Sequence, residues 1–240
     1  MKQIALDIGL ESPPSLANFF VAPGSAGNQA ALAHLQAWLR AGTLGPAESP
    51  APIYLWGEQA SGKTHVLRAA YHALQAQSPH AAHAVGWLDA TVIDPPAFNP
   101  AWNAVLLDDV HLYTPAQQQT AFNWFVNMQA PVQSQTVGVL AAGRLPPADL
   151  PLREDLRTRL GWGHVFALEV LTEPQRRAVL RQAGDARGLF LSDEVMDFML
   201  TRFSRDLGSL MQLLGALDAY ALRTQRALTI PLIRAMLEDK

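Results

Sequence analysis

The segment Gly57–Thr64 constrains the fold of this 240-residue chain more than any other stretch. It reads Gly-Glu-Gln-Ala-Ser-Gly-Lys-Thr and matches the pattern G-x-x-x-x-G-K-[ST]. The apolar run Ile53–Trp56 precedes it, as a buried strand would, and a helical pattern opens at Lys63. Glycines in such a loop let backbone N–H groups approach phosphate oxygens, and the helix N-terminus adds partial positive charge. The sequence therefore predicts a strand, a phosphate-binding loop and a helix that hold a purine nucleoside di- or triphosphate.

Four residues of this loop have distinct expected roles. Gly57 and Gly62 would give the phosphates room, and Lys63 would pair with the β- and γ-phosphates. Thr64 would bind Mg²⁺ through its hydroxyl. The expected cofactors are therefore ADP or ATP, together with Mg²⁺.

Two carboxylates, Asp108 and Asp109, end the apolar run Ala104–Leu107. At the end of a strand beside a phosphate loop, such a pair can hold Mg²⁺ and polarise an attacking water. We expect Asp108 to orient the metal and Asp109 to occupy the water-activating position. The alternative is an ordinary polar strand end that enters a loop.

Strand and helix patterns alternate along the first two thirds of the chain. Strands are predicted at 53–56, 84–88, 104–107, 136–141 and 165–168, and helices at 28–40, 63–77 and 115–128. After residue 169 the pattern becomes helical, with a capping box at Thr172–Gln175 and helices near 192–202, 205–223 and 230–238. The predicted fold class is α/β, with a parallel five-stranded sheet flanked by helices and followed by a small all-helical domain.

Composition excludes several classes of protein. The chain has 18 basic and 21 acidic residues, whereas duplex-DNA binders usually carry a basic excess, so direct sequence-specific DNA binding is not expected. It has no cysteine, which excludes disulfides and cysteine-ligated metals. No run approaches the roughly 18 apolar residues of a membrane span. We expect a soluble cytoplasmic protein with no membrane partner.

The phosphate loop and acidic pair, read with further segments, resemble the AAA+ ATPases, and more narrowly the ATPase domain of the replication initiator DnaA. The segment Asn18–Val21, followed by Asn28, resembles the initiator's segment that lines the adenine pocket. Residues 204–207 resemble the segment that carries the sensor 2 arginine of the lid. The resemblance thus implies that Val21 and Arg205 also contact the nucleotide.

The segment 156–163, Leu-Arg-Thr-Arg-Leu-Gly-Trp-Gly, resembles the initiator's S-R-F-G-W-G segment. The matched arginine there is the arginine finger, which reaches a neighbouring subunit's nucleotide. The resemblance therefore implies that Arg159 is a catalytic arginine supplied in trans. Taken without the resemblance, Arg153, Arg157 and Arg159 could simply form a solvated basic helix face.

The N-terminal segment Gln3–Ile8 resembles the sliding-clamp-binding motif of regulatory DnaA relatives that lack the DNA-binding domain. Gln3, Leu6 and Ile8 would be its anchors, because an extended peptide can place alternate side chains in pockets. Alternation of this kind more often indicates an edge strand. The expected domains are a flexible clamp-binding tail (1–14), an AAA+ nucleotide-binding domain (15–168) and a helical lid (169–240).

The family resemblance implies a negative regulator of chromosomal replication initiation. It would dock on the DNA-loaded sliding clamp, the β subunit of DNA polymerase III, and present Arg159 to ATP bound by DnaA. The fourth strand offers no polar sensor before Arg144, so weak intrinsic ATP hydrolysis is expected. The alternatives are an ATP-dependent helicase loader or DNA-remodelling AAA+ ATPase, and a small-molecule P-loop kinase. Self-association stays open.

Overall fold

A computed structural model describes most of the chain, and it divides into two compact units. The first comprises residues 13–170, and the second begins at Leu171. Four residues with predicted roles, Gln3, Leu6, Ile8 and Arg205, lie outside the described residues. The described ranges are 13–22, 24–41, 51–77, 85–128, 138–203 and 207–238.

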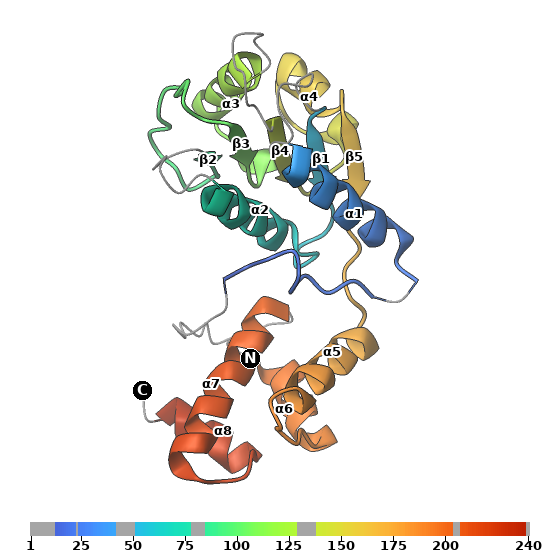
Figure 1. Cartoon of the computed structure of the whole chain (residues 1–240), viewed down its shortest axis with the longest axis vertical. Helices are drawn as coiled ribbons and strands as arrows, with labels where there is room; N and C mark the ends of the chain where they lie inside the picture. The colour runs from blue at the N-terminus through green and yellow to red at the C-terminus, as the bar shows by residue number, and fades with distance from the viewer. Residues whose placement is uncertain are drawn as a thin grey trace. The chain divides into compact units, whose positions relative to one another are not determined.

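The first unit is built on one parallel sheet (Figure 1). Its five strands follow the order β2-β3-β4-β1-β5, and every neighbouring pair is parallel. This confirms the α/β class and the five-stranded parallel sheet. The strands are β1 (Ile53–Trp56), β2 (Val85–Leu88), β3 (Ala104–Leu107), β4 (Gly138–Gly143) and β5 (His164–Ala167).

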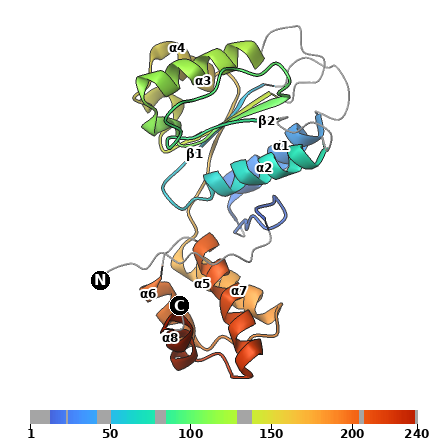
Figure 2. The same ribbon diagram turned by 90° about the vertical axis from the view of Figure 1, so that its left-hand side faces the viewer.

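Helices cover both faces of this sheet, as Figures 1 and 2 show. Successive strand side chains point to opposite faces, so Leu55 packs in one hydrophobic core and its neighbour Tyr54 in the other. One face carries α1 (Ala26–Ala41) and α2 (Lys63–Gln77); the other carries α3 (Pro115–Met128), α4 (Glu154–Leu160) and the short 3₁₀ turns η1 (Val110–Leu112) and η2 (Pro147–Asp149).

The described part of the fourth strand differs from the prediction of 136–141. It runs Gly138–Gly143, and Gly143 pairs with Trp56 of β1. Alanine and glycine have low strand propensity, so the sequence pattern predicted an end at Ala141. Glycine suits this last position because Tyr54 leaves no room for a side chain: a Cβ on Gly143 would lie 2.2 Å from the Tyr54 hydroxyl oxygen.

The second unit consists of helices in its described residues, with a core formed by residues such as Leu180, Met196 and Leu213. The capping box is confirmed, because the Thr172 and Gln175 side chains each bond the other's backbone N–H. No helix in the described ranges combines the length and apolar character needed to cross a bilayer. The helices are α5 (Glu173–Asp185), α6 (Asp193–Arg202), α7 (Leu207–Thr224) and α8 (Ile230–Glu238).

Candidate functional site

The phosphate loop joins the end of β1 to the start of α2, and its two predicted glycines are sterically required. A Cβ on Gly57 would lie 2.4 Å from the Leu168 carbonyl oxygen. Gly62 has φ +90°, and a Cβ there would lie 2.6 Å from the Phe19 ring. The loop therefore keeps a glycine at each end because neighbouring groups leave no space for a side chain.

The segment ahead of α1 lies over this loop. The Phe19 ring is 5.9 Å from the His65 ring, centroid to centroid, and the His65 Nε2 atom is 3.1 Å from the Ser15 carbonyl oxygen. Ser15 and Asn18 exchange two backbone-to-side-chain hydrogen bonds that shape the turn. Val21 is half-buried on the same segment, and its contact with a base stays a prediction.

Lys63 is buried at the first position of α2, with 8% of its surface exposed. Its ammonium group donates to the Gly57 and Glu58 carbonyl oxygens, both at 2.8 Å, and to the Ser61 hydroxyl at 3.3 Å. Burial lowers the pKa of Lys63, while the negative charges of nearby carboxylates oppose that effect. The ammonium group of Lys63 thus lies inside the phosphate loop and joins three of the loop's residues by hydrogen bonds.

The acidic pair follows β3 and reaches the same place. Asp108 is 3% exposed, accepts the Asp109 backbone N–H at 3.0 Å, and is hydrogen-bonded by the Thr64 side chain. Burial is the main cause that raises the pKa of Asp108 to about 6. The structure therefore brings together Thr64 and Asp108, the two predicted Mg²⁺ ligands. Asp109, half-buried, adopts a left-handed backbone with φ 50° where η1 begins.

The chemistry of these donors suits Mg²⁺ held jointly with phosphate. In the described ranges, no group of three His, Cys, Asp or Glu residues is arranged to hold a metal ion. Mg²⁺ in nucleotide sites is usually held by one or two protein oxygens, with waters and substrate phosphates completing its octahedron. Thr64 and Asp108 supply that small protein share. The buried carboxylate, whose ionised form burial disfavours, is the kind of group that a cation would compensate.

Arg159 lies on α4 and is surrounded by aromatic rings. Its guanidinium carbon is 4.8 Å from the Trp162 ring centroid, 5.1 Å from that of Phe122 and 6.0 Å from that of Phe125. Flat guanidinium groups stack favourably on aromatic faces. The rings come from α3 and from the turn after α4, both outside the phosphate loop.

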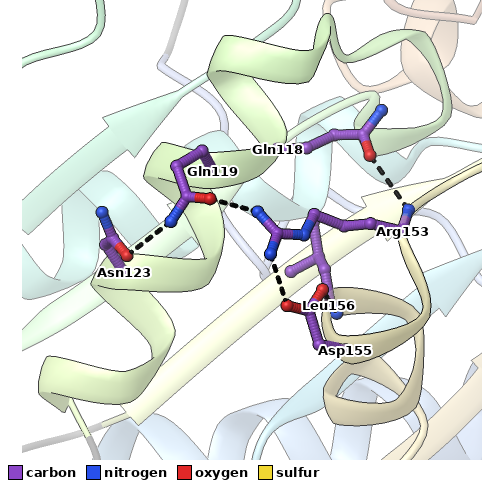
Figure 3. Close-up of polar contacts among 6 residues, drawn as sticks. All are labelled: Gln118, Gln119, Asn123, Arg153, Asp155 and Leu156. Atoms are coloured by element: carbon purple, nitrogen blue, oxygen red, sulfur yellow. Dashed lines mark hydrogen bonds and ion pairs between the residues drawn. The ribbon is translucent and has the colours of Figure 1, made fainter.

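Arg153 is held in a polar network that joins α4 to α3 (Figure 3). Its guanidinium contacts the Gln119 and Asp155 side chains, and its backbone N–H donates to the Gln118 side chain at 3.0 Å. We infer that Arg153 anchors the start of the helix that carries Arg159.

Sequence reasoning missed why the segment after α4 contains Gly163. A Cβ there would lie 1.8 Å from the Pro52 carbonyl oxygen, which accepts the His164 N–H at 2.9 Å. The resemblance singled out Asn28 as part of the segment ahead of the phosphate loop, but not the two hydrogen bonds that its buried side chain makes with the backbone of Glu169, at 2.9 and 3.2 Å. Both contacts join segments more than a hundred residues apart, so no local pattern signals them.

Known proteins resemble this chain at several levels. The family model described as the Hda lid domain matches residues 173–237. An uncharacterized protein of Haemophilus influenzae is 32% identical over 191 residues, which span 77% of this chain and 80% of that protein. These two matches concern sequence, and they extend over both units.

Solved structures share the fold at lower identity. Domain III of the Thermotoga maritima replication initiation protein DnaA has a TM-score of 0.63 and 19% identity, with 94% of this chain and 95% of that chain covered. AMPPCP-bound DnaA from Aquifex aeolicus has a TM-score of 0.60 and 22% identity, and the match covers 84% of this chain and 64% of that chain. The Thermotoga maritima RuvB Holliday junction branch migration motor has a TM-score of 0.59 and 15% identity, and the match covers 94% of this chain and 72% of that chain. With the phosphate loop, the parallel sheet and the matched lid in place, this chain belongs to the Hda-like, DnaA-related AAA+ proteins.

Proposed function

We propose that this protein binds an adenine nucleotide and represses replication initiation by stimulating hydrolysis of the ATP bound to DnaA. Arg159 is the group that it presents to that ATP. The observation that carries the proposal is the setting of Arg159, which is half-buried and stacked on Trp162, a ring that is 58% exposed. Stacking on an exposed ring orients a guanidinium at the protein surface, and a guanidinium is a suitable partner for the phosphates of another protein's nucleotide.

The proposed role of Arg159 is electrostatic. Phosphoryl transfer builds charge on the oxygens of the transferred group, and an arginine supplied in trans can accelerate it by about 10³–10⁵. An arginine finger works best when its direction is already set before the partner arrives. The rings of Phe122, on α3, and Trp162, in the turn after α4, support such an orientation.

The protein's own nucleotide would be held by Gly57, Gly62, Lys63 and Thr64, with Mg²⁺ between Thr64 and Asp108. The AMPPCP bound by Aquifex aeolicus DnaA supports an adenine nucleotide for this fold. Bound ATP or ADP would supply phosphate anions, which Lys63 and the N–H groups at the start of α2 would neutralise. Asp109 would polarise the attacking water. The strand β4 ends in Gly143, which has no side chain to contact the terminal phosphate, and this supports slow hydrolysis of the protein's own ATP.

We also propose that Gln3, Leu6 and Ile8 anchor the chain to the DNA-loaded sliding clamp. The support is their alternate spacing, which suits an extended peptide laid along a groove. A pull-down with the clamp tests this part, by comparing wild type with the Gln3→Ala/Leu6→Ala variant. Equal retention of the two proteins would eliminate clamp docking by this segment.

The central test is hydrolysis of DnaA-bound ATP in the presence of clamp-loaded DNA. Arg159→Ala should reduce stimulation by about a hundredfold or more, while the variant's own nucleotide affinity stays at the wild-type value. Arg181→Ala is the matched control, since Arg181 forms an exposed ion pair with Asp193 in the second unit. Undiminished stimulation by Arg159→Ala would refute the proposal. Strong DNA-stimulated turnover by this protein alone would instead favour a helicase loader or DNA-remodelling ATPase.

A further inference from the structure

Two histidine rings meet where α1 packs beside β5, the strand at one edge of the sheet (Figure 1). The centroid of the His34 ring, on α1, lies 3.9 Å from that of the His164 ring, on β5, and the ring planes are tilted by 54°. Phe166, on the same strand, lies 5.4 Å from His34 and 6.4 Å from His164, centroid to centroid. Neutral imidazoles can pack this closely, as other aromatic rings do, whereas two protonated imidazoles would bring two positive charges together.

The elements around this histidine pair supply no negative charge. α1 packs against β5 and α2, and β5 pairs with β1. These four elements contain no aspartate or glutamate. Glu169 follows β5, but its carboxylate accepts the Ser25 hydroxyl beside Ala26, the first residue of α1, and His34 lies about 12 Å further along that helix. The other titratable or charged residues of the four elements are Arg40 on α1, Tyr54 on β1, and Lys63, His65, Arg68, Tyr71 and His72 on α2.

The surroundings of His34 therefore oppose its protonation. Burial lowers the pKa of His34, and the positive charge of His164 lowers it further. The packed helix thus holds this proton less tightly than an unfolded or detached helix, in which the ordinary pKa of 6.5 applies. The resulting contribution to stability is complete above pH 6.5, and it is lost as the pH falls through the lowered pKa.

The packing of α1 also matters for the end of the first unit. The Asn28 side chain, on α1, accepts the Glu169 backbone N–H at 2.9 Å and donates to the Glu169 carbonyl oxygen at 3.2 Å. Residue 169 lies directly before Val170, the last residue of the first unit. A movement of α1 away from β5 would therefore break the contacts that hold this end of the unit in place.

We propose that the His34–His164 pair makes the contact between α1 and β5 sensitive to protons. While both rings are neutral, they hold the helix on the strand. When the pH falls and both rings become protonated, their repulsion loosens α1 and releases Glu169 from Asn28. Histidine is the side chain suited to this role, because its charge changes between pH 5 and 8. The inference depends neither on the proposed nucleotide site nor on the role of Arg159.

Amide hydrogen exchange of the full chain at about pH 7.5 and about pH 5.5 tests this proposal, after correction for intrinsic exchange rates. The protection of the α1 amides and of the Glu169 amide should fall roughly fivefold or more at the lower pH. The amides of α3, on the other face of the sheet, are the reference, so that any pH effect on the whole unit cancels. His34→Gln should remove most of the fall. His72→Gln, which replaces an exposed histidine of α2, is the matched control and should retain it.

A second variant keeps the test decisive if His34→Gln disturbs the packing of α1. His164→Gln changes an exposed residue, and it should also reduce the fall in α1 protection. In the same variant, the midpoint of the His34 ring titration, followed by NMR, should rise toward 6.5, because the neighbouring positive charge is gone. A wild-type ratio of α1 to α3 protection that does not change with pH would overturn the proposal. So would an undiminished fall in both variants, or a His34 midpoint that does not respond to His164→Gln.

Discussion

Replacing Asp108 by asparagine should stabilise the nucleotide-free protein at neutral pH. Asp108 is 3% exposed, and burial raises its pKa from 3.8 to about 6, with the Asp109 charge adding to the effect. Hydrogen bonds from Thr64 and from the Asp109 N–H oppose it but are weaker. An asparagine keeps one oxygen that can accept the Asp109 N–H, and its NH2 group can donate to the Thr64 hydroxyl oxygen, so the substitution removes the buried charge while both positions keep a hydrogen-bonding group.

The size of the effect follows from the two pKa values. The difference between 3.8 and about 6 corresponds to about 3 kcal/mol between the protonated and ionised states. The folded carboxyl group holds its proton more tightly than the unfolded one does. The stabilisation that comes from this tighter proton binding is therefore complete below pH 3.8, and it is lost as the pH rises through about 6 and the buried carboxyl group ionises. Asparagine does not titrate, so the advantage of Asp108→Asn should grow across that window to about 1–3 kcal/mol.

Urea unfolding followed by tryptophan fluorescence measures this difference. All six tryptophans lie between residues 38 and 162, so the signal reports on the first unit alone. The difference in the free energy of unfolding between Asp108→Asn and wild type should be near zero at pH 4 and largest at pH 7.5. Asp149→Asn, which removes an exposed carboxylate of the same unit, is the control. A difference that is independent of pH, or a variant less stable than wild type at pH 7.5, would refute the reasoning.

Three further substitutions test other contacts. Gly163→Ala should destabilise the first unit by about 3 kcal/mol or more, because its Cβ would lie 1.8 Å from the Pro52 carbonyl oxygen; an unchanged urea midpoint would contradict this. Gln117→Leu should cost about 2–3 kcal/mol in the same assay, because it removes a buried NH2 group whose two hydrogens serve three nearby carbonyl oxygens of the loop after β2. Trp162→Ala should lower stimulated hydrolysis of DnaA-bound ATP severalfold without altering the protein's own nucleotide affinity, because the closest ring to Arg159 is lost. Trp162→Phe should restore most of that stimulation, whereas equal loss in both variants would argue against a stacking role.

Features that depend on a few neighbouring residues were predictable. The helix from Lys63 to Gln77 and the strand Ala104–Leu107 have the bounds that their periodicity indicated. The Thr172 capping box formed because both of its partners lie within one helical turn. In each case the energetic preference is local, so it can be read before the rest of the chain is placed.

Features that depend on distant partners were not predictable in the same way. The fourth strand ends in glycine because Tyr54, on a different strand, occupies the space that a side chain at residue 143 would need. The surroundings of Arg159 include Phe122, from a helix that precedes it by more than thirty residues. The phosphate-loop pattern said nothing of the Glu58–Arg144 ion pair, which joins residues 86 positions apart.

The sequence by itself determined that a phosphate loop, an acidic strand end and an arginine segment exist, because glycine conformation, charge and periodicity act over short distances. Only the tertiary structure decided what those groups meet. It buried Asp108 until its pKa rose, stacked Arg159 on aromatic rings, and set Arg144 against Glu58. Desolvation, ring stacking and ion pairing depend on which groups the packed sheet and helices bring within a few ångströms, and no local pattern specifies those neighbours.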